Sequence, residues 1–232
     1  MSRLIAVFLR HAELDQPKGV PAANLPHALT ADGEDQATEA GQRLFALAEE
    51  FGAKIDDDIE CSPTQAAWQT AAIVAEELDG LTGRDYRAVE RSELAGRSLG
   101  AAANLGIREI ETLIAEDPRY KKPPKGWLTQ PDFRPPFPGA ESPNAAGERV
   151  GEFVRRRAEE MWPHLTGDTL KLFVGHGSAL VAAAAWLGAV PKTAPLKVLP
   201  HAQWTLIEFN ARGRCTLLDA AWRKPAKSDT PD

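Results

Sequence analysis

Two histidines of the sequence follow apolar runs, at points where a strand is expected to end. Arg10 and His11 come directly after the first run, and His176 lies between Gly175 and Gly177 after a later one. Arginine offers a planar fork of N–H donors, and the free backbone N–H groups at the start of a helix favour a bound anion. Arg10, His176 and the amide of Gly177 would therefore form a cradle for a phosphate group.

A neutral imidazole in such a cradle can attack phosphorus as a nucleophile. The product is a phosphohistidine, which water then hydrolyses. The leaving alkoxide needs a proton, and a carboxylic acid can supply it when burial or nearby negative charge raises its pKa. Three glutamates near predicted strand ends are candidates for this acid: Glu13, Glu93 and Glu141. The residues therefore predict cleavage of a phosphate ester.

An isolated Arg-His pair also has a purely structural interpretation. Arg10 could form a surface ion pair, and His11 could bond to a backbone carbonyl. The second histidine favours the phosphate site, because His176 stands between two glycines at a strand-to-helix turn.

The elements that would position these residues alternate between strands and helices. Apolar runs rich in branched residues predict buried strands, and Thr30 and two Ser-Pro pairs can each start a helix. The order predicts an α/β fold, a three-layer sandwich with a mostly parallel central sheet flanked by helices. The predicted strands cover residues 3–9, 57–61, 84–90, 169–174, 204–209 and 215–221, and the predicted helices cover 30–50, 62–78, 107–116, 142–161 and 179–190.

The carboxyl ends of parallel strands meet at one edge of a sheet, where the following loops converge on a crevice. Arg10 and His11, Ser62, and His176 with its flanking glycines each follow a predicted strand. We therefore expect both histidines to share one crevice.

The chain is expected to form one domain over residues 1–223. Residues 104–141 contain seven of the 18 prolines and predict a lid insertion with one helix in an otherwise irregular arm. Residues 224–232 offer too little apolar surface to pack and are predicted to be a flexible tail.

The composition is that of an ordinary globular protein. Of the 232 residues, 43% are hydrophobic, and 27 Lys and Arg against 33 Asp and Glu give a net charge of −6, which argues against disorder and against a basic nucleic-acid binder. The first apolar run is too short for a signal peptide, and the longest, 179–190, is shorter than the ~18 residues that span a bilayer. Cys61 and Cys215 stand alone, without zinc-site spacing. We expect a cytoplasmic protein with neither nucleic-acid nor membrane partners.

Five segments, in order, resemble the histidine phosphatase superfamily, also called the phosphoglycerate mutase-like superfamily. The ordered set is specific, although any single segment is weak. The segments are Leu9-Arg10-His11-Ala12-Glu13 for the RHG motif, Leu29-Thr30-Ala31-Asp32-Gly33 with Gln36-Ala37 for LTxxGxxQA, Ser62-Pro63 with Gln69-Thr70-Ala71 for SPxxRAxQTA, Gly139-Ala140-Glu141-Ser142 for the GGES turn, and Val174-Gly175-His176-Gly177 for the second histidine.

The resemblance implies a phosphatase that hydrolyses a phosphate monoester, with a small molecule as the expected partner. It implies that His11 accepts the phosphoryl group, that Arg10 and His176 bind the phosphate, and that Glu93 takes the place of the proton donor. It also implies that no metal or organic cofactor is needed, and that the 104–141 insertion is a lid that shapes substrate choice.

The sequence departs from the family pattern at several positions. Ala66 stands where the family has a second phosphate-binding arginine, so the cradle has lost a cation. Ala12 replaces the motif glycine, Pro17 replaces a phosphate-contacting asparagine, and the segment after Glu93 is about one residue shorter than usual.

Other residues could support the site or replace the missing cation. Glu13, Ser62, Gln65 and Arg97 are candidates for support. The candidates for the replacement are Arg84, Arg87 and Arg97 after the third strand, and Lys121, Lys122, Lys125 and Arg134 on the arm. The alternative is that the basic residues of the arm are solvated and balance nearby acids.

Two other functions stay open at this point. A phosphoglycerate mutase would return the phosphoryl group to its substrate, and a catalytically degenerate module would bind phosphoryl ligands without turnover. A metal site built from His27, His164 and His201 is disfavoured, because no two histidines have helical ligand spacing. The sequence also allows a homodimer.

Overall fold

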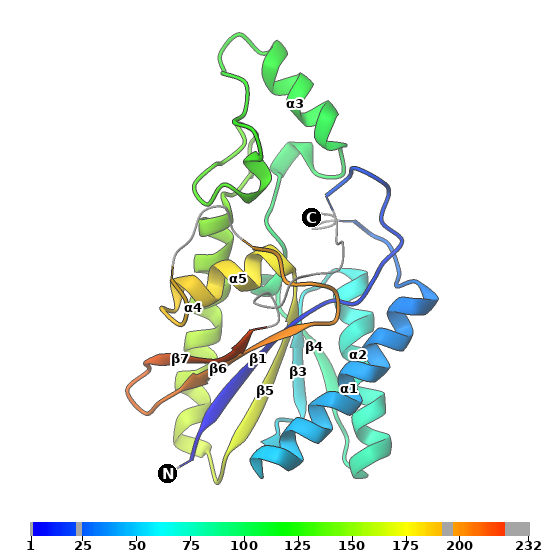
Figure 1. Cartoon of the computed structure of the whole chain (residues 1–232), viewed down its shortest axis with the longest axis vertical. Coiled ribbons are helices and arrows are strands. Elements are labelled where there is room, and N and C mark those ends of the chain that lie inside the picture. Colours follow the sequence, from blue (N-terminus) through cyan, green and yellow to red (C-terminus); the bar gives the residue numbers. More distant parts are fainter. Residues whose placement is uncertain (1, 22–24, 192–196, 221–232) are drawn as a thin grey trace.

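The computed structural model describes residues 2–21, 25–191 and 197–220, and within them the strands form a seven-stranded sheet (Figure 1). The strand order is β4-β3-β5-β1-β6-β7, with β2 pairing with β5. The first five strands run parallel, whereas β6 and β7 are antiparallel to their neighbours. The strands are β1 (Leu4–Arg10), β2 (Lys54–Ile55), β3 (Asp58–Cys61), β4 (Arg87–Glu90), β5 (Thr169–Gly175), β6 (Trp204–Phe209) and β7 (Cys215–Ala220).

Helices cover both faces of this sheet, as predicted for a three-layer sandwich. The alternation of side chains along a strand explains this arrangement. In β1, Leu4, Ala6 and Phe8 join the core on the side of α4 and α5, whereas Ile5 and Val7 join the core on the side of α1 and α2. The helices are α1 (Ala31–Phe51), α2 (Gln65–Thr82), α3 (Ile107–Glu116), α4 (Pro143–Met161) and α5 (Gly177–Trp186).

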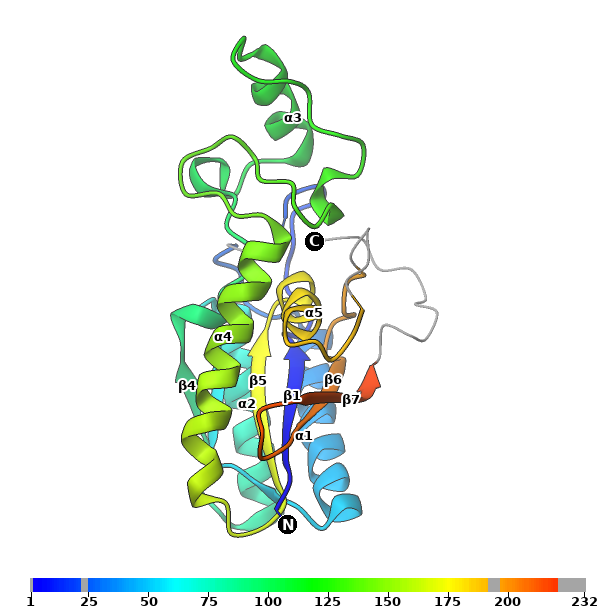
Figure 2. The same cartoon turned by 90° about the vertical axis from the view of Figure 1, so that its left-hand side faces the viewer.

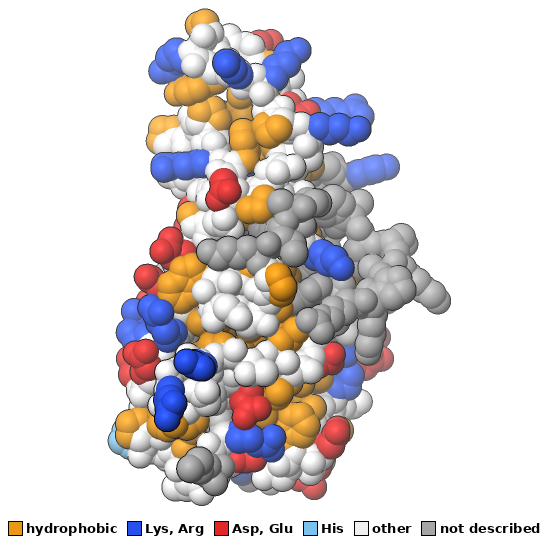
Figure 3. Space-filling model, turned by 60° about the vertical axis from the view of Figure 1, so that its left-hand side comes forward, with side chains coloured by type: hydrophobic (Ala, Val, Ile, Leu, Met, Phe, Trp, Pro, Cys, Tyr) orange, Lys and Arg blue, Asp and Glu red, His pale blue; other side chains and the backbone are white. Residues whose placement is uncertain are grey.

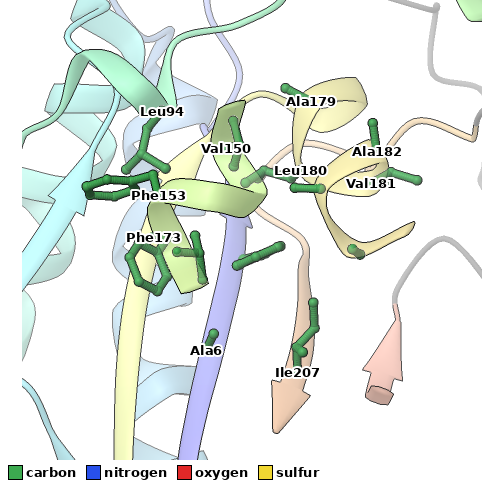
Figure 4. Close-up of a cluster of buried hydrophobic side chains, with 14 of the residues drawn as sticks. Ala6, Leu94, Val150, Phe153, Phe173, Ala179, Leu180, Val181, Ala182 and Ile207 are labelled. Carbon is green, nitrogen blue, oxygen red and sulfur yellow. The ribbon is translucent and has the colours of Figure 1, made fainter. Parts of the chain in front are cut away.

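The core between α4, α5 and the sheet is closely packed (Figure 4). Phe173 of β5 meets Phe153 of α4 edge-on, with ring centroids 6.2 Å apart. Gly147 lets α4 approach α5, because a Cβ at this position would lie 2.5 Å from the Cβ of Ala182. This packing fixes α5, whose first turn begins at the candidate site.

Strand register brings the predicted crevice residues to one edge. Arg10 is opposite Gly175, and the amide of His11 donates to the Gly175 carbonyl at 2.9 Å. The amide of Ser62 donates to the Val174 carbonyl at 2.9 Å. The ends of β1, β3 and β5 are therefore level, and the side chains that follow them share this edge.

The 104–141 insertion stands beyond the carboxyl edge of the parallel strands, with α3 near its outer end (Figure 2). It has a small core of its own around Trp127, Ile110 and Ile114. Lysine and arginine side chains project from its surface (Figure 3), and Lys121, Lys122, Lys125 and Arg134 are exposed. Their exposure agrees with the interpretation that they are solvated.

Several predicted bounds are wrong. The second helix begins at Gln65 with Thr64 as its N-cap, because Ser62 still hydrogen-bonds within the sheet. The fifth helix ends at Trp186, because Gly188 takes a φ of +77° and the next amide donates back to the Ala184 carbonyl. The strand predicted at 84–90 covers only Arg87–Glu90.

Some elements were not predicted at all. They are strand β2 and the 3₁₀ turns Ser92–Leu94, Gly100–Ala102, Trp127–Thr129 and Trp162–His164. The predicted tail at 224–232 and the last residue of the final predicted strand lie outside the described residues. None of the described helices is long and apolar enough to cross a membrane.

Candidate active site

His11 lies at the carboxyl end of β1 and is 1% exposed. Its Nδ1 lies 2.9 Å from the carbonyl oxygen of Ala12. A carbonyl oxygen only accepts, so Nδ1 carries the proton and Nε2 keeps its lone pair. The His176 ring centroid is 5.1 Å away, which places the two imidazoles side by side. The prediction that both histidines come together at this edge is confirmed, and we call the group of side chains around them the crevice.

The imidazoles of this edge are held in the neutral form. Burial lowers the pKa of His11 well below its usual value, and the repulsion that a charged His11 would meet from a charged His176 and from Arg10 lowers it further. Burial and then Arg10 lower the pKa of His176 to about 3. Because only a neutral imidazole has a free lone pair, these shifts keep His11 in its nucleophilic form at neutral pH.

His176 is the N-cap of α5 and contacts hydroxyl groups that follow β3. Its Nε2 lies 3.0 Å from the Oγ of Ser62 and 3.4 Å from the Oγ1 of Thr64. Gly177 begins the helix where a side chain has no room, because a Cβ there would lie 2.7 Å from the Leu199 carbonyl oxygen. Ser62 is therefore beside the histidine pair, as expected, whereas Thr64 was not predicted.

Arg10 is buried and reaches across to the segment that precedes β6. Its Nη1 donates to the Leu199 carbonyl oxygen at 2.9 Å, and its Nη2 lies 2.6 Å from the Nε2 of His201. The ring centroids of His201 and His11 are 5.4 Å apart. The structure thus adds a third imidazole to the crevice.

The sequence contained a signal for His201. It lies three residues before a predicted closing strand, and a strand antiparallel to β1 must begin at the edge where β1 ends. A second unpredicted contact comes from Thr70, whose Oγ1 accepts a hydrogen bond from the amide of Ala12 at 3.0 Å. It fixes the backbone directly after the nucleophile candidate.

Two of the candidate acids are held by other groups. The Oε1 of Glu13 accepts a hydrogen bond from the Thr30 hydroxyl at 3.2 Å, at the start of α1. Burial alone would raise the pKa of Glu141, but hydrogen bonds from Arg149 and the Ser98 amide lower it. Glu141 is therefore an ionised partner of Arg149 rather than a proton donor.

Glu93 lies in the 3₁₀ turn after β4, and its side chain is 37% exposed. Its carboxylate accepts hydrogen bonds from Arg156 of α4 and from the Ser92 hydroxyl, both at 3.2 Å. Within the described residues, no hydrogen bond joins it to His11 or His176. In this conformation Glu93 faces α4.

The place of the missing arginine holds the buried methyl group of Ala66. Gln65 beside it is exposed. Arg97 does not replace the cation, because its guanidinium donates to the carbonyls of Glu141, Leu128 and Phe133, each at 2.9 Å. The expectation that Arg97 supports the phosphate site is wrong, since these long-range partners make it a structural residue of the arm.

Arg84 and Arg87 are also engaged elsewhere. Arg84 pairs with Asp57, and Arg87 pairs with Asp58 at 2.6 Å. In the described ranges, no three His, Cys, Asp or Glu side chains are arranged to hold a metal ion. Among the described residues, the crevice offers the guanidinium of Arg10, three neutral imidazoles, hydroxyl groups and the N-terminus of α5, which together suit a tetrahedral oxyanion.

Solved structures with the same fold include several enzymes. One is a mycobacterial glucosyl-3-phosphoglycerate phosphatase, with 21% identity, a TM-score of 0.64 and coverage of 92% of this chain and 96% of that one. A putative alpha-ribazole-5'-P phosphatase from Escherichia coli has 23% identity, a TM-score of 0.68 and coverage of 92% and 94%. A phosphoglycerate mutase from Bacillus anthracis has 18% identity, a TM-score of 0.68 and coverage of 94% and 93%.

No curated protein sequence matches the chain significantly. The family model of the histidine phosphatase superfamily (branch 1) matches residues 6–221, which is nearly the whole chain and includes every crevice residue described above. The chain therefore belongs to branch 1 of the histidine phosphatase superfamily.

Proposed function

We propose that this protein is a phosphatase that hydrolyses a small-molecule phosphate monoester through a phosphohistidine on His11. The observation that carries the proposal is the hydrogen bond of His11 Nδ1 to the Ala12 carbonyl, which leaves Nε2 unprotonated beside the His176 ring. Two of the similar structures are named phosphatases, and their names specify phosphate monoesters. These names support the class of substrate.

The proposed reaction has two steps, and both take place at the Nε2 atom of His11. In the first, the Nε2 lone pair of His11 attacks phosphorus, the bond from phosphorus to the ester oxygen breaks, and a proton passes to the leaving alkoxide. In the second, water attacks the phosphohistidine and gives a proton to the carboxylate that donated in the first step, the bond from phosphorus to Nε2 breaks, and phosphate leaves. Arg10, His176 and the first amides of α5 would bind the phosphoryl oxygens, whose charge increases in the transition state.

We keep Glu93 as the proposed proton donor. It lies directly after β4, and its side chain is partly exposed rather than locked in the core. To donate, it would have to turn from Arg156 toward the crevice and bind a proton. An Arg156→Met variant should therefore not lose turnover, whereas Glu93→Gln should lower kcat by about a hundredfold or more.

Turnover of p-nitrophenyl phosphate tests the proposal. The wild-type protein should hydrolyse the ester in the presence of a chelator, and His11→Ala should abolish turnover while leaving the fold intact. His164→Ala is the matched control, because this histidine is exposed on a turn after α4. Turnover in His11→Ala equal to that of the wild type would contradict the proposal.

A second candidate function is a module that binds phosphoryl ligands without turnover. The buried Ala66 in place of an arginine and the Glu93 contact with Arg156 favour it. Loss of one contact that strengthens in the transition state typically costs about 2.7 to 4 kcal/mol. Tight binding of phosphate by a wild-type protein that releases no p-nitrophenol would favour this module over the phosphatase.

A further inference from the structure

The turn that precedes β6 is held against β1 by several backbone hydrogen bonds. The amide of Gln203 donates to the Pro200 carbonyl at 3.1 Å and closes the turn. The amide of Ala202 donates to the His11 carbonyl at 3.4 Å, and the amide of Arg10 donates to the Gln203 carbonyl at 3.0 Å. The two middle residues of this turn, 201 and 202, therefore have a fixed position relative to the nucleophile candidate.

The backbone of the turn is strained. Ala202 has a φ of +49°, in the left-handed region that side-chain-bearing residues other than asparagine and aspartate rarely adopt. Glycine is the usual residue at a turn position with positive φ. Arg43 of α1 donates to the Ala202 carbonyl and helps to hold this conformation. Strained backbone of this kind often occurs at functional sites, where the surrounding contacts maintain it.

The strained turn presents His201 to Arg10. The Nε2 of His201 lies 2.6 Å from Arg10 Nη2. A guanidinium only donates, so Nε2 accepts this hydrogen bond and the imidazole carries its proton on Nδ1. Burial and then Arg10 lower the pKa of His201 to about 3, so the acceptor persists at neutral pH.

The contacts that orient the Arg10 guanidinium are especially important in this chain. Its Nη1 donates to the Leu199 carbonyl oxygen, so Leu199 and His201, two residues apart in one segment, orient a single guanidinium plane. Ala66 takes the place of the second arginine of the family pattern, and it packs in one apolar cluster with Ala202. The orientation of Arg10 therefore carries more of the phosphate binding than it would in a site with two arginines.

We propose that His201 is a positioning residue of the phosphate site, which holds the Arg10 guanidinium in the orientation that binds a phosphoryl group. The inference rests on the proposed function only in that the ligand is a phosphate or phosphate ester. In this inference His201 accepts a hydrogen bond that orients the Arg10 guanidinium, and it takes no covalent part in the reaction.

Binding of inorganic phosphate, measured by calorimetry, tests this role separately from turnover. His201→Ala should weaken phosphate binding by about tenfold, since one hydrogen bond to a charged group is lost. The KM for p-nitrophenyl phosphate should rise by a similar factor, with a smaller change in kcat. His201→Gln should recover much of the affinity, because its amide oxygen can accept from Arg10.

Two controls separate positioning from general packing. Ala202→Gly removes the strained side chain and keeps the imidazole, so phosphate affinity should stay within about twofold of wild type. Thermal unfolding should show that every variant is folded. If His201→Gln binds phosphate as weakly as His201→Ala, the hydrogen-bond role is wrong.

The outcomes also separate this inference from the proposed function. If the wild type turns over ester and His201→Ala binds phosphate equally well, the inference is wrong and the phosphatase stands. If the wild type binds phosphate without turnover and His201→Ala weakens binding, the phosphatase is wrong and the inference stands. A wild-type protein that neither binds phosphate nor turns over ester contradicts both.

Discussion

The crevice around His11 and the arm, residues 104–141, are held in place by different kinds of contact. At the crevice, backbone hydrogen bonds between β1, β5 and the turn before β6 place His11, His176 and His201. The arm is joined to the body through arginine side chains: Arg97 donates to three carbonyls, and Arg149 pairs with Glu141 and donates to the carbonyls of residues 93, 95 and 96. The crevice thus depends on strand register, whereas the arm depends on arginine side chains together with isolated backbone hydrogen bonds, such as the one from the Asn144 amide to the Pro131 carbonyl.

This difference determines which substitutions each of the two regions tolerates. A strand register cannot change by one residue without moving every side chain of the strand to the other face. An arginine that binds loop carbonyls can be exchanged or lost with effects confined to the loop. The arm can therefore change its shape without moving the histidines.

The largest expected effect is a loss of local stability in the arm. Arg97→Met should leave three carbonyl oxygens without their charged donor and destabilise the arm by about 3 kcal/mol or more. Hydrogen exchange should become faster over residues 104–141 and stay unchanged in β1 and β5. Arg134→Met, at an exposed position, is the control. Faster exchange in β1 in place of the arm would contradict the separation of the two regions.

A smaller loss of stability is expected when a methyl group is added at the start of α5, inside the crevice. Gly177→Ala places a Cβ 2.7 Å from the Leu199 carbonyl oxygen and 3.0 Å from the Cδ of Arg10. Such overpacking typically costs about 1 to 3 kcal/mol of unfolding free energy, and here it should also weaken phosphate binding. Gly167→Ala has open space around it and should change neither quantity. Equal behaviour of the two variants would show that the Leu199 segment is not closely packed on α5.

The effect that is smallest near neutral pH, and grows on acidification, concerns the pH dependence of folding stability. The pKa of His176 falls from 6.5 to about 3 in the folded state, so below pH 6.5 the unfolded chain binds more protons than the folded one. Folding stability should therefore decrease as pH falls from 6.5 toward 3, by up to about 1.4 kcal/mol per pH unit for this group. His176→Gln should show a shallower decrease in denaturant unfolding. Parallel curves for the two proteins would contradict a buried neutral imidazole.

Much of the body could be predicted from local patterns. The apolar runs that end at Leu9 and Val174 predict β1 and β5, and Thr30 caps α1 by accepting from the Gly33 amide at 3.0 Å. Helix α3 and strand β6 have the predicted bounds. These features depend on neighbouring residues, which a single sequence displays.

The features that could not be predicted depend on distant partners. The role of His201 arises because antiparallel pairing brings it to Arg10 across 191 positions of sequence. The three acceptors of Arg97 are carbonyls whose positions follow from the folded path of the arm. Likewise, the direction of the Glu93 carboxylate is set by Arg156 on another element. Residue types alone therefore predicted the histidine pair, but not the contacts that His201, Arg97 and Glu93 make with distant residues.

Trapping of the covalent intermediate tests the central claim most directly. The protein would be mixed with p-nitrophenyl phosphate, quenched in alkali, digested and analysed by mass spectrometry, with His11→Ala and His164→Ala treated in parallel. The account predicts a phosphoryl group on the peptide that contains His11, in the wild type and in His164→Ala but not in His11→Ala. Turnover without any phosphorylated histidine, or with the phosphoryl group on another residue, would contradict it.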